Sequence, residues 1–151
     1  MSHQSGLAAA ARELLEDMRS RTDGFDGTDG SLWFVQGALA SMANDPRRRA
    51  GAGLTARFAY ALYVAELLES SCPGVHVEVE AADARMAEVS AVSDHGRREF
   101  VFSWVERCVE DPNADNIVFK YAGALRDFDQ PARAARLDEQ LRELAASGHR
   151  F

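Results

Sequence analysis

Residues 54–80, LTARFAYALYVAELLESSCPGVHVEVE, contain the change of pattern on which the fold depends. From about residue 55 to 69 the segment is apolar on nearly every helical face, which is typical of a buried central helix. Cys72-Pro73-Gly74 predicts the end of that helix. The next six residues alternate between valine and a polar residue, which predicts a half-buried strand. This region therefore indicates a fold that combines helices with a sheet.

Two further helices are predicted before this region. Apolar residues recur at helical spacing over residues 7–19 and again from about residue 32 to 42. Between them lies a loop of alternating aspartates and glycines, residues 23–30, which is rich in turn formers. Asp29 or Ser31 is expected to cap the second helix. We expect the Arg- and Gly-rich segment after it, up to Gly53, to form a loop.

The sheet is expected to be small and antiparallel. A weaker strand is predicted over residues 85–93, after a turn at residues 81–84. Asp94-His95-Gly96 then predicts a hairpin turn. Residues 99–102 read as a third strand or as the start of the next helix. The fold class that follows is α+β, with five or six helices packed on a two- or three-stranded antiparallel sheet in a single domain, residues 1–151.

Three helices are predicted after the sheet. A short one ends at Asp111-Pro112, Asn113 or Asp115 is expected to cap the next, and Pro131 is expected to open the last. The last helix carries only about two heptads of apolar stripe, which is short for an independent coiled coil. It either packs on the core or forms a homodimer contact, and a homo-oligomeric structural protein is one interpretation of the chain.

Charge and hydropathy exclude two classes of partner. The chain of 151 residues carries 24 Asp or Glu against 17 Lys or Arg, a formal net charge of −7. Nucleic acids attract clustered cations, so we expect no nucleic-acid binding. No apolar run approaches the roughly 18 residues that a membrane span needs, and no signal peptide is visible at the N-terminus. We therefore predict a cytoplasmic protein without a membrane partner.

Residue usage indicates a bacterial source. Lys120 is the only lysine, so arginine supplies nearly all the positive charge, and alanine is abundant, as in proteins of GC-rich genomes. Cys72 and Cys108 both lie in apolar surroundings. We expect them to be two buried thiols in a reducing cytosol rather than a disulfide.

Two groups of acidic residues invite a metal interpretation, but neither has the required pattern. The aspartates of the 23–30 loop are three residues apart, whereas an EF-hand spaces its first carboxylates two apart and ends in a bidentate Glu. We expect a turn whose last carboxylate caps a helix. His76, Glu78 and Glu80 share one face of a strand, but zinc sites usually draw ligands from several elements. We therefore predict no metal and no cofactor.

A cysteine nucleophile would require Cys108 with His95 as its base. A reactive thiolate needs electropositive, partly open surroundings. Cys108 instead lies on an apolar helical stripe beside acidic residues. We expect an inert buried thiol and favour a protein that is not an enzyme.

Glu66 is an acidic residue on the predicted central helix. A buried carboxylate is costly unless it is paired, and carboxylates with perturbed pKa values mark functional sites. Together with Tyr60 and Tyr63 it predicts, as an alternative function, an enzyme or small-ligand-binding protein with a cleft at these residues. The structural interpretation is that Glu66 lies at the rim of the core, or forms an ion pair with an arginine such as Arg57 or Arg107.

A non-catalytic protein-binding module is the function that the sequence favours. The segment from residue 66 to 94 is rich in carboxylates, which suits a partner with a basic surface. An immunity protein or a secretion chaperone is a concrete example. Arg47-Arg48-Arg49 is a compact cationic run that could hold a phosphate or an acidic peptide. The residues expected to contact a partner are Glu78, Glu80, Glu88, Arg47, Arg48 and Arg49.

Three short stretches resemble a group of small bacterial domains of unknown function. They are Asp29-Gly30-Ser31-Leu32 at a helix start, Tyr63-Val64-Ala65-Glu66 with Ala in place of an expected Gly, and Phe102-Ser103-Trp104-Val105 leading to Tyr121. A tryptophan expected in the first strand is absent. The resemblance covers residues 29–128, implies the same helix–sheet–helix order and no chemistry, and adds interest to Glu66.

Overall fold

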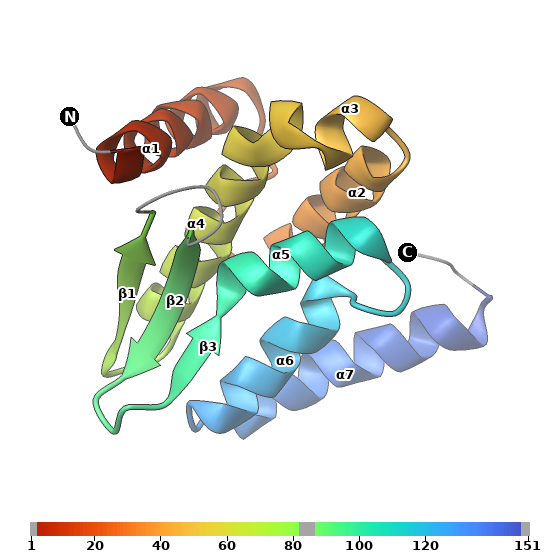
Figure 1. The fold of residues 1–151 in the computed structure, drawn as a ribbon. Coiled ribbons are helices and arrows are strands. Elements are labelled where there is room, and N and C mark those ends of the chain that lie inside the picture. Colours follow the sequence, from red (N-terminus) through yellow and green to blue (C-terminus); the bar gives the residue numbers. More distant parts are fainter. Residues whose placement is uncertain (1–2, 82–86, 149–151) are drawn as a thin grey trace.

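The computed structural model describes residues 3–81 and 87–148 and has an α+β fold, which confirms the predicted class. A three-stranded antiparallel sheet lies against helices that come from both halves of the chain (Figure 1). In chain order the described elements are α1 (His3–Arg21), α2 (Ser31–Ala43), α3 (Pro46–Arg49), the 3₁₀ turn η1 (Gly51–Gly53), α4 (Leu54–Ser71), β1 (Val75–Glu80), β2 (Glu88–Ser93), β3 (Arg98–Phe100), α5 (Val101–Glu110), α6 (Ile117–Asp127) and α7 (Pro131–Ala146).

Helix α4 is the central helix that the sequence predicts. It runs through the middle of the molecule, with α1 on one side and α5 on the other (Figure 1). Phe58, Leu62 and Leu68 are completely buried on it. Burying one such side chain contributes about 1.5–3 kcal/mol to the free energy of folding. Helix α4 is apolar on nearly every face because neighbouring elements pack against nearly every face.

The sheet has the order β1-β2-β3, and one of its faces lies on α4. Val77 pairs with Ala91 across the β1–β2 ladder, and Ala91 pairs with Glu99 of β3, so these three positions share the inner face. Within the described residues, no helix covers the opposite face (Figure 1). The backbone N–H of Val77 donates to the carboxylate of Glu69 at 2.9 Å, and this contact occupies part of the free edge of β1.

The predicted ends of the sheet need small adjustments. Strand β2 begins at Glu88, later than predicted, and the expected turn at residues 81–84 falls largely outside the described residues. The hairpin turn is confirmed, with Gly96 at φ +82°, a conformation that favours glycine. Residues 98–100 form β3, and α5 follows it directly.

Helix α6 is capped by Asn116, not by Asn113 or Asp115 as predicted. The Asn116 side chain accepts from the backbone N–H groups of Val118 at 2.8 Å and Phe119 at 3.2 Å. Asn116 directly precedes the first helical residue in an extended conformation, which is the position that a cap requires.

The last helix packs on α6 within the chain. Pro131 opens it as predicted, Ala134 and Leu137 are buried, and Gly148 at φ +79° follows its end. Its role in a homodimer stays a prediction. No helix in the described part of the chain is long and apolar enough to cross a membrane.

Candidate functional site

The Arg-rich segment after α2 forms a helical turn, not the predicted loop. Asp45 accepts a hydrogen bond from the backbone N–H of Arg47 at 3.0 Å, and Pro46 occupies the first helical position, so α3 begins with a standard cap. The 3₁₀ turn η1 follows and leads into α4. Helix α3 was not predicted, and with it the described residues form seven helices against the five or six expected.

Arg57 of α4 holds this turn in place. Its side chain is only 6% exposed, and its Nη1 donates to the carbonyl oxygens of Arg48 at 2.5 Å and Ala50 at 2.9 Å. A Cβ atom on Gly53 would lie 1.8 Å from the Arg48 carbonyl oxygen. The turn can approach this closely only because residue 53 is a glycine.

A carboxylate from α5 completes the surroundings of Arg57. The Nε atom of Arg57 donates to Oε1 of Glu106 at 2.7 Å, and the Glu106 side chain is 37% exposed. A charge-assisted hydrogen bond of this kind is stronger than a neutral one. The pair therefore ties α5 to α4 beside the α3–η1 turn.

Two adjoining hollows lie between the α3–η1 turn and α5, and we call them together the α3–α5 groove. The first has a volume of about 470 Å³, and Leu54, Arg57, Phe102, Ser103, Glu106 and Arg107 line it together with Gly51 and Ala87. The second has a volume of about 380 Å³, and Pro46, Arg49, Ala50, Glu106, Val109 and Glu110 line it. Glu106 belongs to the lining of both hollows.

Four arginines around this groove have no carboxylate partner among residues 3–81 and 87–148. None of the ion pairs among the described residues includes Arg47, Arg48, Arg49 or Arg107. All four are exposed, and Arg49 and Arg107 line the groove itself. In a protein of net charge −7 this is a local concentration of unpaired positive charge.

The residues of the expected ligand cleft lie elsewhere and are engaged. Glu66 of α4 pairs with Arg12 at 3.5 Å and Arg19 at 3.1 Å, which confirms the predicted pairing with an arginine but not the examples Arg57 and Arg107. Glu66, Tyr60 and Tyr63 do not line the α3–α5 groove, nor do they line a third hollow of about 300 Å³ between the β2–β3 hairpin turn and the end of α6. Glu66 is therefore a paired surface residue between α1 and α4.

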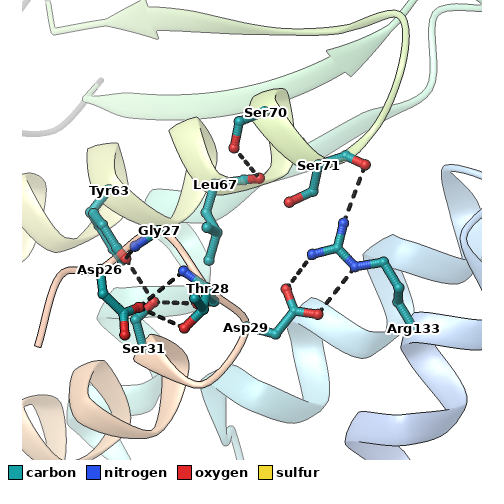
Figure 2. Close-up of polar contacts among 10 residues, drawn as sticks. All are labelled: Asp26, Gly27, Thr28, Asp29, Ser31, Tyr63, Leu67, Ser70, Ser71 and Arg133. Atoms are coloured by element: carbon teal, nitrogen blue, oxygen red, sulfur yellow. Dashed lines mark hydrogen bonds and ion pairs between the residues drawn. The ribbon is translucent and has the colours of Figure 1, made fainter.

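Tyr60 and Tyr63 belong to the packing between α4 and the loop before α2. Tyr63 accepts from the backbone N–H of Gly27 at 3.1 Å and donates to the Ser31 hydroxyl at 2.6 Å (Figure 2). Tyr60 is 6% exposed and stacks on Phe25, and burial raises the pKa of its hydroxyl. Both tyrosines thus hold the loop against α4.

The aspartates of this loop serve structural roles. Asp26 accepts from the backbone and hydroxyl of Thr28, and these contacts lower the pKa of its carboxyl. Asp29 was expected to cap α2, but it binds both Nε and Nη2 of Arg133 on α7, at 3.1 and 2.6 Å (Figure 2). Gly30 is the capping residue and has no side chain to accept a hydrogen bond. Among the described residues no cluster of ligands could hold a metal ion.

The acidic residues expected to contact a partner are mostly engaged within the chain. Glu88 accepts from the backbone N–H groups of Phe102 and Ser103, so it caps α5. Glu78 pairs with Arg98 at 2.5 Å, which holds the pKa of the Glu78 carboxyl below its usual range. Glu80 is exposed on the uncovered face of the sheet. These contacts reduce the acidic surface that the sequence predicts.

Cys108 is buried, as predicted, and its thiol forms a hydrogen bond inside the core. It donates to the side-chain oxygen of Gln36 at 3.4 Å, and that oxygen also accepts from the backbone N–H of Ile117 at 2.8 Å. Burial raises the pKa of the Cys108 thiol to about 11. Cys72 is likewise free and buried. The buried amide of Gln36 was not predicted, because a single Gln in an apolar helix carries no local signal.

A carboxyl pair joins β3 to α6. Glu99 is 15% exposed, and burial together with a hydrogen bond to Asp127 raises the pKa of its carboxyl to about 7. The same contact lowers the pKa of Asp127, which also binds Arg97 at 2.8 Å. Glu99 therefore holds its proton more tightly than an exposed Glu.

Comparison with known proteins adds no relative. No family model, no curated protein and no solved structure matches the chain. The site must accordingly be judged by its own residues, and the α3–α5 groove is the candidate that they favour.

Proposed function

We propose that this chain is a non-catalytic protein-binding module that receives an acidic segment of a partner protein in the α3–α5 groove. The observation that carries the proposal is that Arg49 and Arg107 line an open groove without any carboxylate partner among the described residues. Arginine is enriched at protein interfaces because its planar guanidinium binds carboxylates in a bidentate manner.

The groove also offers apolar contact. Leu54 and Phe102 line the first hollow, and Val109 lines the second. A partner segment that alternates acidic and apolar side chains would match this arrangement of cations and apolar floor. Both hollows are open to solvent, whereas small-molecule sites usually bury most of the ligand. These features support a protein segment over a small molecule as the occupant.

A basic partner on the uncovered face of the sheet is the second candidate. Phe100 lies on that face with half of its surface exposed, and Glu80 lies on the same face. The Glu78–Arg98 ion pair already neutralises part of this surface. For this reason we place the acidic partner first.

We further propose that the module acts in a bacterial cytosol, as an immunity protein or a secretion chaperone would. The arginine-rich composition and the two free, buried thiols support this setting. An acidic segment held in an arginine-lined groove is a contact by which either kind of protein could mask its partner.

The test uses two labelled peptides of equal length, one alternating Glu and Leu and the other alternating Lys and Leu. Fluorescence anisotropy should show binding of the acidic peptide, weakening as salt shortens the Debye length from about 30 Å at 0.01 M to about 8 Å at 0.15 M. Arg107→Glu should abolish most of this binding. Arg136→Glu is the matched control, because Arg136 is also exposed but lies on α7.

Two results would overturn the proposal. One is equal loss of binding in the two arginine variants, which would indicate net charge rather than a site. The other is preference for the basic peptide. If Glu80→Lys then removed that binding, the uncovered face of the sheet would replace the groove as the binding surface.

A further inference from the structure

We infer that Glu106 occupies, within the chain, the place that a carboxylate of the bound segment takes on Arg57. The groove is then partly blocked by its own side chain, and it opens when one carboxylate exchanges for another. The inference rests on the proposed function. It adds that Arg57 recognises a carboxylate of the partner segment and that Glu106 competes with this carboxylate.

Arg57 is a fixed receptor for a carboxylate. Its Nη1 donates to the Arg48 and Ala50 carbonyl oxygens, so the edge that carries Nε and Nη2 remains for an anion. That edge presents two parallel N–H groups, the arrangement that a carboxylate binds best. With only 6% of its side chain exposed, Arg57 cannot turn away to find another partner.

Glu106 is the replaceable member of the pair. Its side chain is 37% exposed, and Arg57 is the partner it has among the described residues. Moving Glu106 into solvent therefore exposes a charge that is already partly hydrated. Leaving Arg57 unpaired is costly, because a buried charge needs a partner, so Glu106 leaves only when another carboxylate arrives.

The position of Glu106 gives this exchange a consequence for binding. Glu106 lines both hollows, Arg107 lines the first and Arg49 lines the second, and neither arginine has an ion pair among the described residues. When it moves out, the groove widens beside the buried guanidinium of Arg57, which lines the first hollow. An acidic segment can then place one carboxylate on Arg57 and others near the two flanking arginines.

The experiment compares Glu106→Gln with Glu110→Gln in the anisotropy assay with the Glu–Leu peptide. Glu110 also lines the groove but has no ion pair among the described residues, so its variant removes the same charge without removing the competitor. We expect Glu106→Gln to raise affinity about tenfold, because charge-assisted contacts are stronger than surface pairs. Glu110→Gln should change it by about fivefold or less, as for a surface charge.

A third variant separates competition from charge. Glu106→Asp keeps the charge and shortens the side chain, so it should bind Arg57 less well and raise the affinity for the peptide. It also serves if Glu106→Gln fails to fold. Circular dichroism of each variant checks that the helices are retained.

The outcomes separate the two claims. A larger gain for Glu106→Gln than for Glu110→Gln, together with a gain for Glu106→Asp, supports the exchange. Equal gains, or a loss at Glu106, overturn it while the salt-sensitive binding of the natural chain leaves the proposed function standing. If neither the natural chain nor any variant binds the acidic peptide, both claims fail.

Discussion

The ion pairs on the two sides of α4 differ in burial and in which charge α4 provides. On the side of α1, Glu66 of α4 binds Arg12 and Arg19, and all three side chains are at least 32% exposed. On the side of α5, the α4 residue is Arg57, only 6% exposed, and it binds Glu106. The first pairing neutralises a surface, whereas the second fixes a buried cation beside a hollow, and the neighbouring arginines have no ion pair among the residues that the structure describes.

This difference shows that burial is a better guide to a functional side chain than the residue type and its position in the sequence pattern. Glu66 was a candidate because it is an acidic residue on an apolar helix. In the structure it is partly hydrated and paired with two arginines. Arg57 lies on the same helix and is the side chain with functional potential, because a desolvated charge interacts more strongly with its partners. The predictions below test this contrast.

Removing Arg57 should have the largest effect. Arg57→Ala deletes the partner of Glu106 and the donor to two carbonyl oxygens. We expect the free energy of unfolding to fall by about 3 kcal/mol, the lower part of the range for broken buried pairs because Glu106 reaches water. Urea denaturation measures it. A loss below about 1 kcal/mol would show that the Arg57 side of α4 resembles the Glu66 side.

Gly53→Ala should have the next largest effect. The added Cβ would meet the Arg48 carbonyl oxygen at 1.8 Å, so the α3–η1 turn must move away from Arg57. We expect a loss of about 2–3 kcal/mol and weaker binding of the acidic peptide. Gly51→Ala is the matched control, since nothing lies within 4 Å of its added Cβ. Similar losses in the two variants would contradict the close packing of the turn.

The carboxyl of Glu99 should make stability depend on pH. Its folded-state pKa is raised from 4.5 to about 7 by burial and by Asp127. Stability from the bound proton is therefore complete below about pH 4.5 and is lost as pH rises through 7.

Glu99→Gln carries no such proton, so the natural chain should lose about 2–3 kcal/mol relative to it between pH 5 and pH 8. Thermal or urea unfolding at several pH values measures this difference. The lowered pKa of Asp127 acts in the opposite direction and only in acid, where its protonation destabilises the fold. Parallel pH curves for the two proteins would mean that Glu99 titrates like an exposed Glu.

Removing the charge of Glu66 should have the smallest effect. Glu66→Gln breaks two exposed ion pairs, each of which contributes about 0–1 kcal/mol. We expect less than about 1 kcal/mol in the free energy of unfolding and no change in peptide binding. A loss as large as that of Arg57→Ala would remove the contrast between the two sides of α4.

Local patterns predicted most of the fold. The alternation from Val75 to Glu80 predicted β1, and the apolar α4 predicted a buried helix. The capping residues were less predictable, because several Asn and Asp candidates precede α6 and only the geometry selects Asn116. Glu88 caps α5 from β2, a contact that exists only after the chain has folded.

The groove itself could not be predicted. Arg57, Arg48 and Glu106 come from three segments, and no spacing rule relates them. The contact between Asp29 and Arg133 likewise joins residues more than one hundred positions apart. The sequence predicted a loop at Arg47–Arg49, and the structure adds that the next residues turn back onto Arg57. Tertiary contacts of this kind determine which charged side chains form ion pairs, and the local sequence does not show them.

The most direct test is an NMR titration of the ¹⁵N-labelled chain with the Glu–Leu peptide, following backbone amides and the Nε–H of Arg57. The account predicts that the largest shifts map to α3, η1 and α5, and that the Arg57 Nε–H signal changes as its carboxylate partner is exchanged. Shifts confined to the uncovered face of the sheet around Glu80 and Phe100, or no shifts at all, would contradict it.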